Sequence, residues 1–263
     1  MKKLLSFVIV LLSATLMMTS GCVETGNVKK ESSAESGKPE PASKSEPAFG
    51  TKQSGETSVP SYTGEAPKTL AIFPFENNSV TNPQTFTPLC KGLAAMLITD
   101  LSKSGSSLKV VERENIKALI EEMAFSESGV VDESTAVRLG KILGAQSIAF
   151  GSFIVMGNQV RIDSRIIKVE TGELIMADSI MGGSDNFMGL VNDLARKLAA
   201  SLKVAFHAAK PGTQSSLDAA LFFCKGLDAF DRGNKTEADL LFRKCLEIDP
   251  AYKTQVENIQ GIN

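Results

Sequence analysis

The residue types on which enzymes most often rely are scarce in this chain of 263 residues. It has no tryptophan and a single histidine, His207. One imidazole cannot form a conventional two-histidine metal site, and no cysteine lies near it in the sequence. The acidic residues flanking Arg113 open a predicted helix, where carboxylates suit the helix dipole. We therefore predict no cofactor, no metal site and no catalytic residues, so the protein is expected not to be an enzyme.

Neither basic patches nor paired cysteines stand out. Once residues 1–21 are set aside, 26 basic and 30 acidic residues remain, a net charge of −4, which argues against a nucleic-acid partner. Cys90, Cys224 and Cys245 fall in apolar stretches without metal-ligand or redox spacing and are predicted to be small buried side chains. A Cys224–Cys245 disulfide in an oxidising compartment is the alternative.

The N-terminus has the pattern of a secretory signal peptide. Lys2 and Lys3 precede an apolar run that ends near Met18, and small residues follow. Because this run is too short to cross a bilayer, residues 1–21 are predicted to be a signal peptide.

Thr19-Ser20-Gly21-Cys22 resembles a bacterial lipobox, although leucine is commoner at the position of Thr19. The resemblance implies cleavage before Cys22, a diacylglyceryl thioether on its sulfur and acylation of the new N-terminus. Three acyl chains would hold the chain on a membrane. Val23 resembles a signal for the outer membrane. The alternative is an ordinary signal peptide with a chance cysteine.

Residues 22–67, which follow the predicted cleavage, have the composition of a tether. Ser, Gly, Glu, Lys and Pro dominate them, and large apolar residues are almost absent between Val28 and Val59. Such a segment cannot bury enough surface to offset its chain entropy, so we predict a disordered spacer.

Hydrophobic periodicity then predicts one α/β domain over residues 68–207. The expected order is β-α-β-α-α-β-β-β-α, a mixed sheet covered by helices. Gly182-Gly183-Ser184 is expected to form a flexible turn before the last helix. Residues 214–263 are predicted to form a separate helical hairpin, with helices near 216–231 and 234–248.

Short strings in the α/β domain resemble the CsgG-like family, the curli production assembly and transport component. They are Ala71-Ile72-Phe73-Pro74-Phe75-Glu76-Asn77, Val110-Val111-Glu112-Arg113-Glu114-Asn115-Ile116, Leu143-Gly144-Ala145-Gln146 and Gly151-Ser152-Phe153. The family includes the FlgO group and lipoprotein activators of peptidoglycan synthases. The resemblance implies a periplasmic α/β domain, lipid-anchored to the outer membrane, often oligomeric, with a role in secretion or envelope assembly.

The second helical segment resembles a tetratricopeptide repeat (TPR) over residues 219–252. Phe222, Gly226, Ala238, Phe242 and Pro250 match the repeat pattern, whereas Lys225 and Ala229 depart from it. One repeat cannot bury its own apolar face, so the hairpin is expected to dock on the main domain, on a second copy or on a partner. Arg113, Phe222, Gly226 and Phe242 are the candidate interaction residues.

These features predict a non-enzymatic assembly or export component that binds other envelope proteins and is a candidate homo-oligomer. Two alternatives remain open. A long tether also suits an activator that reaches a peptidoglycan synthase, and channel members of the resembled family form oligomeric secretion pores. The pore needs additional alternating hairpins, and the one alternating stretch here, Val160 to Ile167, is already required by the predicted sheet.

Overall fold

A six-stranded mixed sheet organises the part of the chain that the structure describes. The computed structural model describes residues 64–103, 107–122, 133–207 and 216–261, all within the compact unit Gly55–Asn263. The predicted signal peptide, Cys22 and nearly all of the predicted tether lie outside these residues.

The strands run in the order β3-β1-β4-β5-β6, with β2 pairing β4 off this path. β1, β2, β3 and β4 pair in parallel, whereas β4, β5 and β6 form two antiparallel hairpins of ten-residue strands. Gly157 and Gly172, both at positive φ, lie in the connections between these strands, as the predicted turns require. The strand bounds are β1 (Thr69–Ile72), β2 (Glu76–Asn77), β3 (Lys109–Val110), β4 (Ser147–Met156), β5 (Gln159–Lys168) and β6 (Leu174–Gly183).

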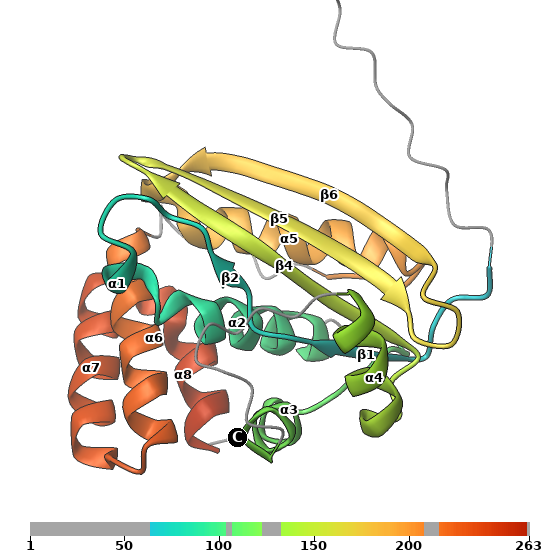
Figure 1. Cartoon of the computed structure of the whole chain (residues 1–263). Coiled ribbons are helices and arrows are strands. Elements are labelled where there is room, and N and C mark those ends of the chain that lie inside the picture. Colours follow the sequence, from blue (N-terminus) through green and yellow to red (C-terminus); the bar gives the residue numbers. More distant parts are fainter. Residues whose placement is uncertain (1–63, 104–106, 123–132, 208–215, 262–263) are drawn as a thin grey trace, which may run out of the picture. The chain divides into compact units, whose positions relative to one another are not determined.

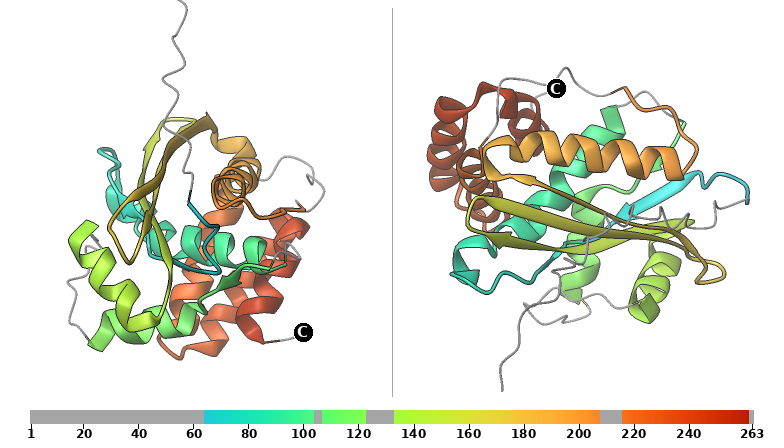
Figure 2. Two further views of the ribbon diagram at one scale, coloured as in Figure 1. Left: turned by 90° about the vertical axis from the view of Figure 1, so that its right-hand side faces the viewer. Right: turned by 90° about the horizontal axis from the view of Figure 1, so that it is seen from above.

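Helices lie on both faces of the sheet (Figures 1 and 2). α4 packs against one face and α5 against the other, and α2 lies on the α5 side. The helix bounds are α1 (Pro83–Phe86), α2 (Leu89–Lys103), α3 (Arg113–Glu122), α4 (Glu133–Leu143), α5 (Phe187–Ser201), α6 (Leu217–Asp231), α7 (Lys235–Ile248) and α8 (Lys253–Gln260). Short 3₁₀ turns, Ser184–Asn186 and Pro250–Tyr252, precede α5 and α8. The predicted fold class, a mixed sheet covered by helices with further helices at the C-terminus, is confirmed.

The core follows from the two periodicities in the sequence. Along α5, Val191, Leu194 and Leu198 recur every three or four residues and are fully buried. Along β5, Val160, Ile162 and Ile166 alternate with exposed polar side chains and are also fully buried. The apolar stripe of α5 and the alternate residues of β5 therefore pack together on one side of the sheet.

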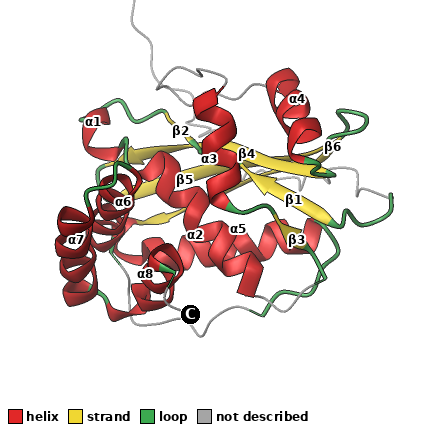
Figure 3. Cartoon of the chain, turned by 90° about the horizontal axis from the view of Figure 1, so that it is seen from below, coloured by secondary structure: helices red, strands yellow, loops and turns green. Residues whose placement is uncertain are grey.

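The helices at the C-terminus lie beside α2 (Figure 3). Their buried residues belong to the same hydrophobic cluster as the core of the α/β domain. α6 and α7 form a hairpin, and α6 packs on α2. Local signals set the ends of these helices: Ser216 caps α6, and Asn234 caps α7 by accepting a hydrogen bond from the Glu237 amide. Of the three expected docking arrangements, the structure shows the hairpin on its own α/β domain.

One local expectation is wrong. Gly182 and Gly183 do not form a turn; they are the last residues of β6 and pair with Val160 and Gln159 of β5. A Cβ on Gly182 would lie 2.7 Å from Leu190 Cδ2, so the missing side chain lets α5 approach the strand.

Candidate interaction surface

The residues that sequence reasoning singled out fall into two groups. Gly226 and Phe242 face each other inside the α6–α7 hairpin, where a Cβ on Gly226 would lie 2.6 Å from the Phe242 ring. Both are buried, so their contacts lie within the chain. Phe222 is half-buried, and the ammonium groups of Lys225 and Lys244 lie 6.0 and 5.8 Å from its ring centroid. The TPR assignment stays a prediction.

Arg113 begins α3 and reaches across to the end of α6. Its Nη1 donates a 2.6 Å hydrogen bond to Asp231 Oδ1, while its Nη2 pairs with Glu114 at 2.7 Å. Lys117 adds a 3.0 Å hydrogen bond to the Asp231 carbonyl oxygen. The Arg113 and Asp231 side chains are only 13% and 6% exposed, so this cluster fastens the helical hairpin to the α/β domain.

A glycine lies at the second point of attachment. A Cβ on Gly92 of α2 would overlap the Cys224 sulfur of α6 and lie 2.9 Å from its Cβ. The two helices cross closely here because Gly92 has no side chain. We name the Gly92–Cys224 crossing and the Arg113–Asp231–Lys117 cluster together the helical junction.

The three cysteine side chains serve as packing groups and not as reactive thiols. Burial raises the pKa of Cys90 to about 11 and of Cys245 to about 12, and raises the pKa of Cys224 well above its usual value. Because the thiolate is the reactive form, these cysteines are poor nucleophiles near neutral pH. All three are free thiols, and the alternative Cys224–Cys245 disulfide is not formed. Within the described ranges, no group of His, Cys, Asp and Glu is arranged to hold a metal ion.

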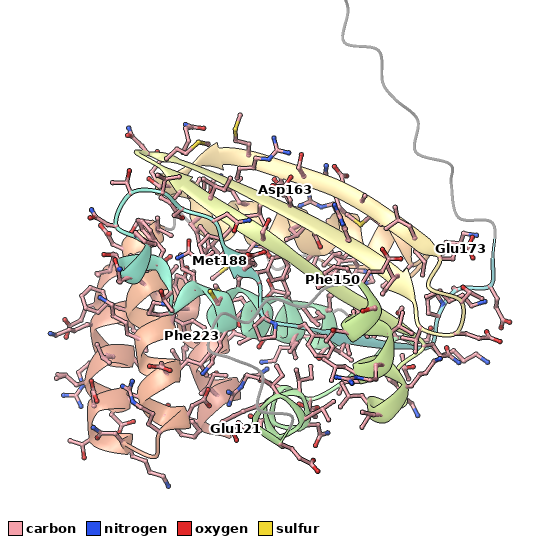
Figure 4. All side chains as sticks on the ribbon, in the orientation of Figure 1. Glu121, Phe150, Asp163, Glu173, Met188 and Phe223 are labelled. Atoms are coloured by element: carbon pink, nitrogen blue, oxygen red, sulfur yellow. The ribbon has the colours of Figure 1, made fainter. Side chains whose placement is uncertain are left out.

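The largest feature that sequence reasoning missed is an uncovered part of the sheet. α4 covers the Ile148 and Ile167 end of one face, and no described helix covers the other end of that face. We name this region the outer sheet surface; it consists of Ser152, Ile154, Met156, Gln159, Arg161, Asp163, Ser179 and Met181. Asp163 points outward from it in Figure 4.

Two methionines and an ion pair dominate the outer sheet surface. Met156 and Met181 are 50% and 64% exposed, an unusual position for such side chains. Arg161 lies opposite Met181 in the strand register, and its guanidinium donates hydrogen bonds of 2.6 to 3.0 Å to Asp163. These hydrogen bonds raise the pKa of Arg161, so it stays charged. Flexible methionine beside a planar cation is typical of protein-binding surfaces.

The neighbouring edge of β6 is less open to a partner. Asp178 Oδ1 accepts the Ser179 backbone N–H at 2.7 Å, and Lys197 donates to the Ser179 carbonyl oxygen at 3.3 Å. Lys197 and Asp178 also pair with each other at 2.7 Å. Because side chains occupy the backbone N–H and carbonyl groups of Ser179, strand pairing is hindered at this point of the edge, which favours the exposed face as the binding surface.

Comparison with known proteins finds a family model that matches part of the chain. Residues 58–161 match the model of the family described as "Curli production assembly/transport component CsgG". The resemblance predicted from the short strings is therefore confirmed for this segment, which runs from before β1 into β5. The comparison with curated proteins gives no match.

Three solved structures with a loosely similar arrangement come from bacteria. The lipoprotein GNA1162 from Neisseria meningitidis has 19% identity and a TM-score of 0.39, covering 52% of this chain and 99% of that one. The LpoB C-terminal domain from Salmonella enterica has 15% identity and a TM-score of 0.31, covering 46% and 86%. The PelC dodecamer from Paraburkholderia phytofirmans has 12% identity and a TM-score of 0.31, covering 59% and 96%. This likeness is too distant to transfer any property.

Proposed function

We propose that this protein is a lipid-anchored outer-membrane component, facing the periplasm, that serves the assembly or export of surface material. It works by binding other envelope proteins and not as an enzyme. The observation that carries the proposal is the match of residues 58–161 to the curli production assembly/transport family. The exposed methionines of the outer sheet surface supply a binding region, and the lipobox-like Cys22 supplies the anchor.

Binding at the outer sheet surface is tested by placing a charge there. Met181→Asp should weaken partner binding by about 30-fold or more, because a carboxylate replaces one of the two large exposed apolar contacts of the surface. Since Met181 is 64% exposed, stability should change by less than about 0.5 kcal/mol. Complementation of a deletion strain measures function, and urea denaturation measures stability.

Leu240→Asp is the matched control, since Leu240 is 51% exposed on α7, away from the sheet. A photo-crosslinking residue at position 181 should capture a protein from intact cells, and a product of twice the chain's mass would identify a second copy. If Met181→Asp complements as well as the control, the outer sheet surface is not the binding region.

The predicted lipid anchor on Cys22 is tested by a separate experiment. Cys22→Ala should abolish palmitate labelling and leave only a small minority of the protein in the outer-membrane fraction, because the acyl chains supply the attachment. Density fractionation of the cell envelope measures this directly. Cys90→Ala is the control for loss of a thiol that carries no predicted lipid. Unchanged fractionation of Cys22→Ala with membranes would contradict the anchor.

None of the described helices has the length and hydropathy needed to span a membrane.

A further inference from the structure

The last helix, α8, is fastened to α2 by polar side chains rather than by apolar packing alone. Gln255 Nε2 donates a 2.7 Å hydrogen bond to Asp100 Oδ1, and Asn258 Nδ2 donates a 3.2 Å hydrogen bond to Thr99 Oγ1. Gln255 and Thr99 are each 3% exposed. The contact is therefore largely shielded from water, and each polar atom in it without a hydrogen-bond partner lowers the stability of the fold.

Two atoms of this contact have no hydrogen-bond partner among the described residues. They are the second oxygen of the carboxylate, Asp100 Oδ2, and the amide oxygen, Gln255 Oε1. Both are acceptors, so neither can satisfy the other while the carboxylate is ionised. A proton on Oδ2 would turn it into a donor for Oε1. A carboxylic acid and a primary amide have the donors and acceptors for two hydrogen bonds running in opposite directions.

We propose that the Asp100–Gln255 contact is a proton-dependent latch, which holds α8 on α2 while Asp100 is neutral and loosens when Asp100 is ionised. The proton taken up on Oδ2 comes from solvent and returns to it. This inference does not rest on the proposed function.

The surroundings of Asp100 favour the neutral form. Burial raises the pKa of Asp100 from 3.8 to about 6. The hydrogen bond from Gln255 and the positive charge of Lys103 lower the pKa, but by less than burial raises it. Lys103 lies on α2 itself. Several charged side chains on the helices packed against α2 form ion pairs of their own. On α8, Lys253 pairs with Glu257 at 3.8 Å, and on α6, Asp228 pairs with Lys91 at 3.8 Å and Arg232 at 2.6 Å. On α5, Arg196 pairs with Asp193 at 2.5 Å, and Lys197 pairs with Asp178 at 2.7 Å. On β3, which also packs against α2, the charged residue Lys109 is exposed to solvent.

The direction of the pH effect follows from this shift. When the Asp100 pKa is higher with α8 docked than with α8 released, docking binds a proton more tightly and is strongest at low pH. Docking weakens as the pH rises from about 4 through about 6 and is then constant. If release of α8 returned the Asp100 pKa fully from about 6 to its ordinary value of 3.8, the docking equilibrium would fall about tenfold between pH 5 and pH 7.5, which is the largest fall that this shift allows.

Hydrogen exchange of the α8 amides in the full chain tests the latch. Protection factors, which correct for the intrinsic effect of pH on exchange, should fall by up to about tenfold for peptides covering residues 253–260 between pH 5 and pH 7.5. In Asp100→Asn the side chain cannot ionise and can donate to Gln255 Oε1, so protection should stay high at both pH values. Peptides from β5 serve as the internal reference for global stability.

Asn258→Ala is the matched control, because it removes the other α8–α2 contact without a titrating group. It should lower protection at every pH while keeping the same fall with pH. If Asp100→Asn does not fold, carbon-13 titration of the Asp100 carboxyl in the unsubstituted chain decides instead: a midpoint near 6 supports the latch. A midpoint near 4, a flat wild-type profile or an equal fall in Asp100→Asn would overturn it.

Discussion

Gly92→Ala is expected to lower the free energy of unfolding by about 2–3 kcal/mol, although alanine is normally the better helix former. The added methyl group would overlap the Cys224 sulfur, and the Cys224 Cβ and Cα would lie 2.9 and 3.4 Å away. Cys224 is 1% exposed within a packed core, so α6 has to move away from α2. Urea denaturation followed by circular dichroism measures the loss.

A second substitution separates the clash from a general helix effect. Cys224→Gly in the Gly92→Ala background removes the two closest atoms, so the pair should show a favourable coupling of about 1–3 kcal/mol in a double-mutant cycle. Gly189→Ala is the matched control in α5, where the three atoms nearest to the new methyl group belong to the exposed Asn186 side chain, which can change its rotamer. Gly189→Ala should be neutral or slightly stabilising. Equal losses for Gly92→Ala and Gly189→Ala would contradict the close crossing.

Regular elements were predictable from the sequence because their burial repeats with the period of the element. Val191, Leu194 and Leu198 fall on the buried side of α5, and the alternation of β5 gives its buried residues correctly. α2 was predicted from the helical spacing of its large apolar residues, although residues 92–99 are buried all round the helix. β2 and α1 were missed, since two and four residues are too few to show a period. The turn expected at Gly182 was misjudged because a glycine inside a strand and a glycine in a turn look alike in sequence.

The candidate site was predictable only in part, because its contacts join distant residues. Arg113 was singled out, but nothing near it in the sequence indicates Asp231, which lies 118 residues away. Asp100 reads as an ordinary polar residue within a helix until Gln255, 155 residues later, packs against it. The outer sheet surface was missed because alternation shows which side of β5 is buried, but not how far a helix covers the other side.

Arg113→Met is expected to cost about 2–3 kcal/mol of unfolding free energy, the second large effect at the helical junction. It leaves the Asp231 carboxylate, 6% exposed, without its 2.6 Å partner. Removing one member of a buried ion pair typically costs about 3–5 kcal/mol. The loss should be somewhat smaller here, because Lys117 Nζ remains 3.8 Å from the carboxylate. Urea denaturation again provides the measurement.

Removing both charges distinguishes two causes of the loss: a buried Asp231 carboxylate without its ionic partner, and lost packing of the Arg113 side chain. In Arg113→Met with Asp231→Leu, no buried charge remains, and stability should return to within about 1 kcal/mol of the wild type. Arg196→Met, which breaks an exposed pair with Asp193, is the matched control and should cost less than about 0.5 kcal/mol. A double variant as unstable as Arg113→Met alone would mean that the Arg113 side chain acts through packing. Recovery would mean that the pair chiefly fixes which face of α6 meets α3, because its net contribution to stability is then small.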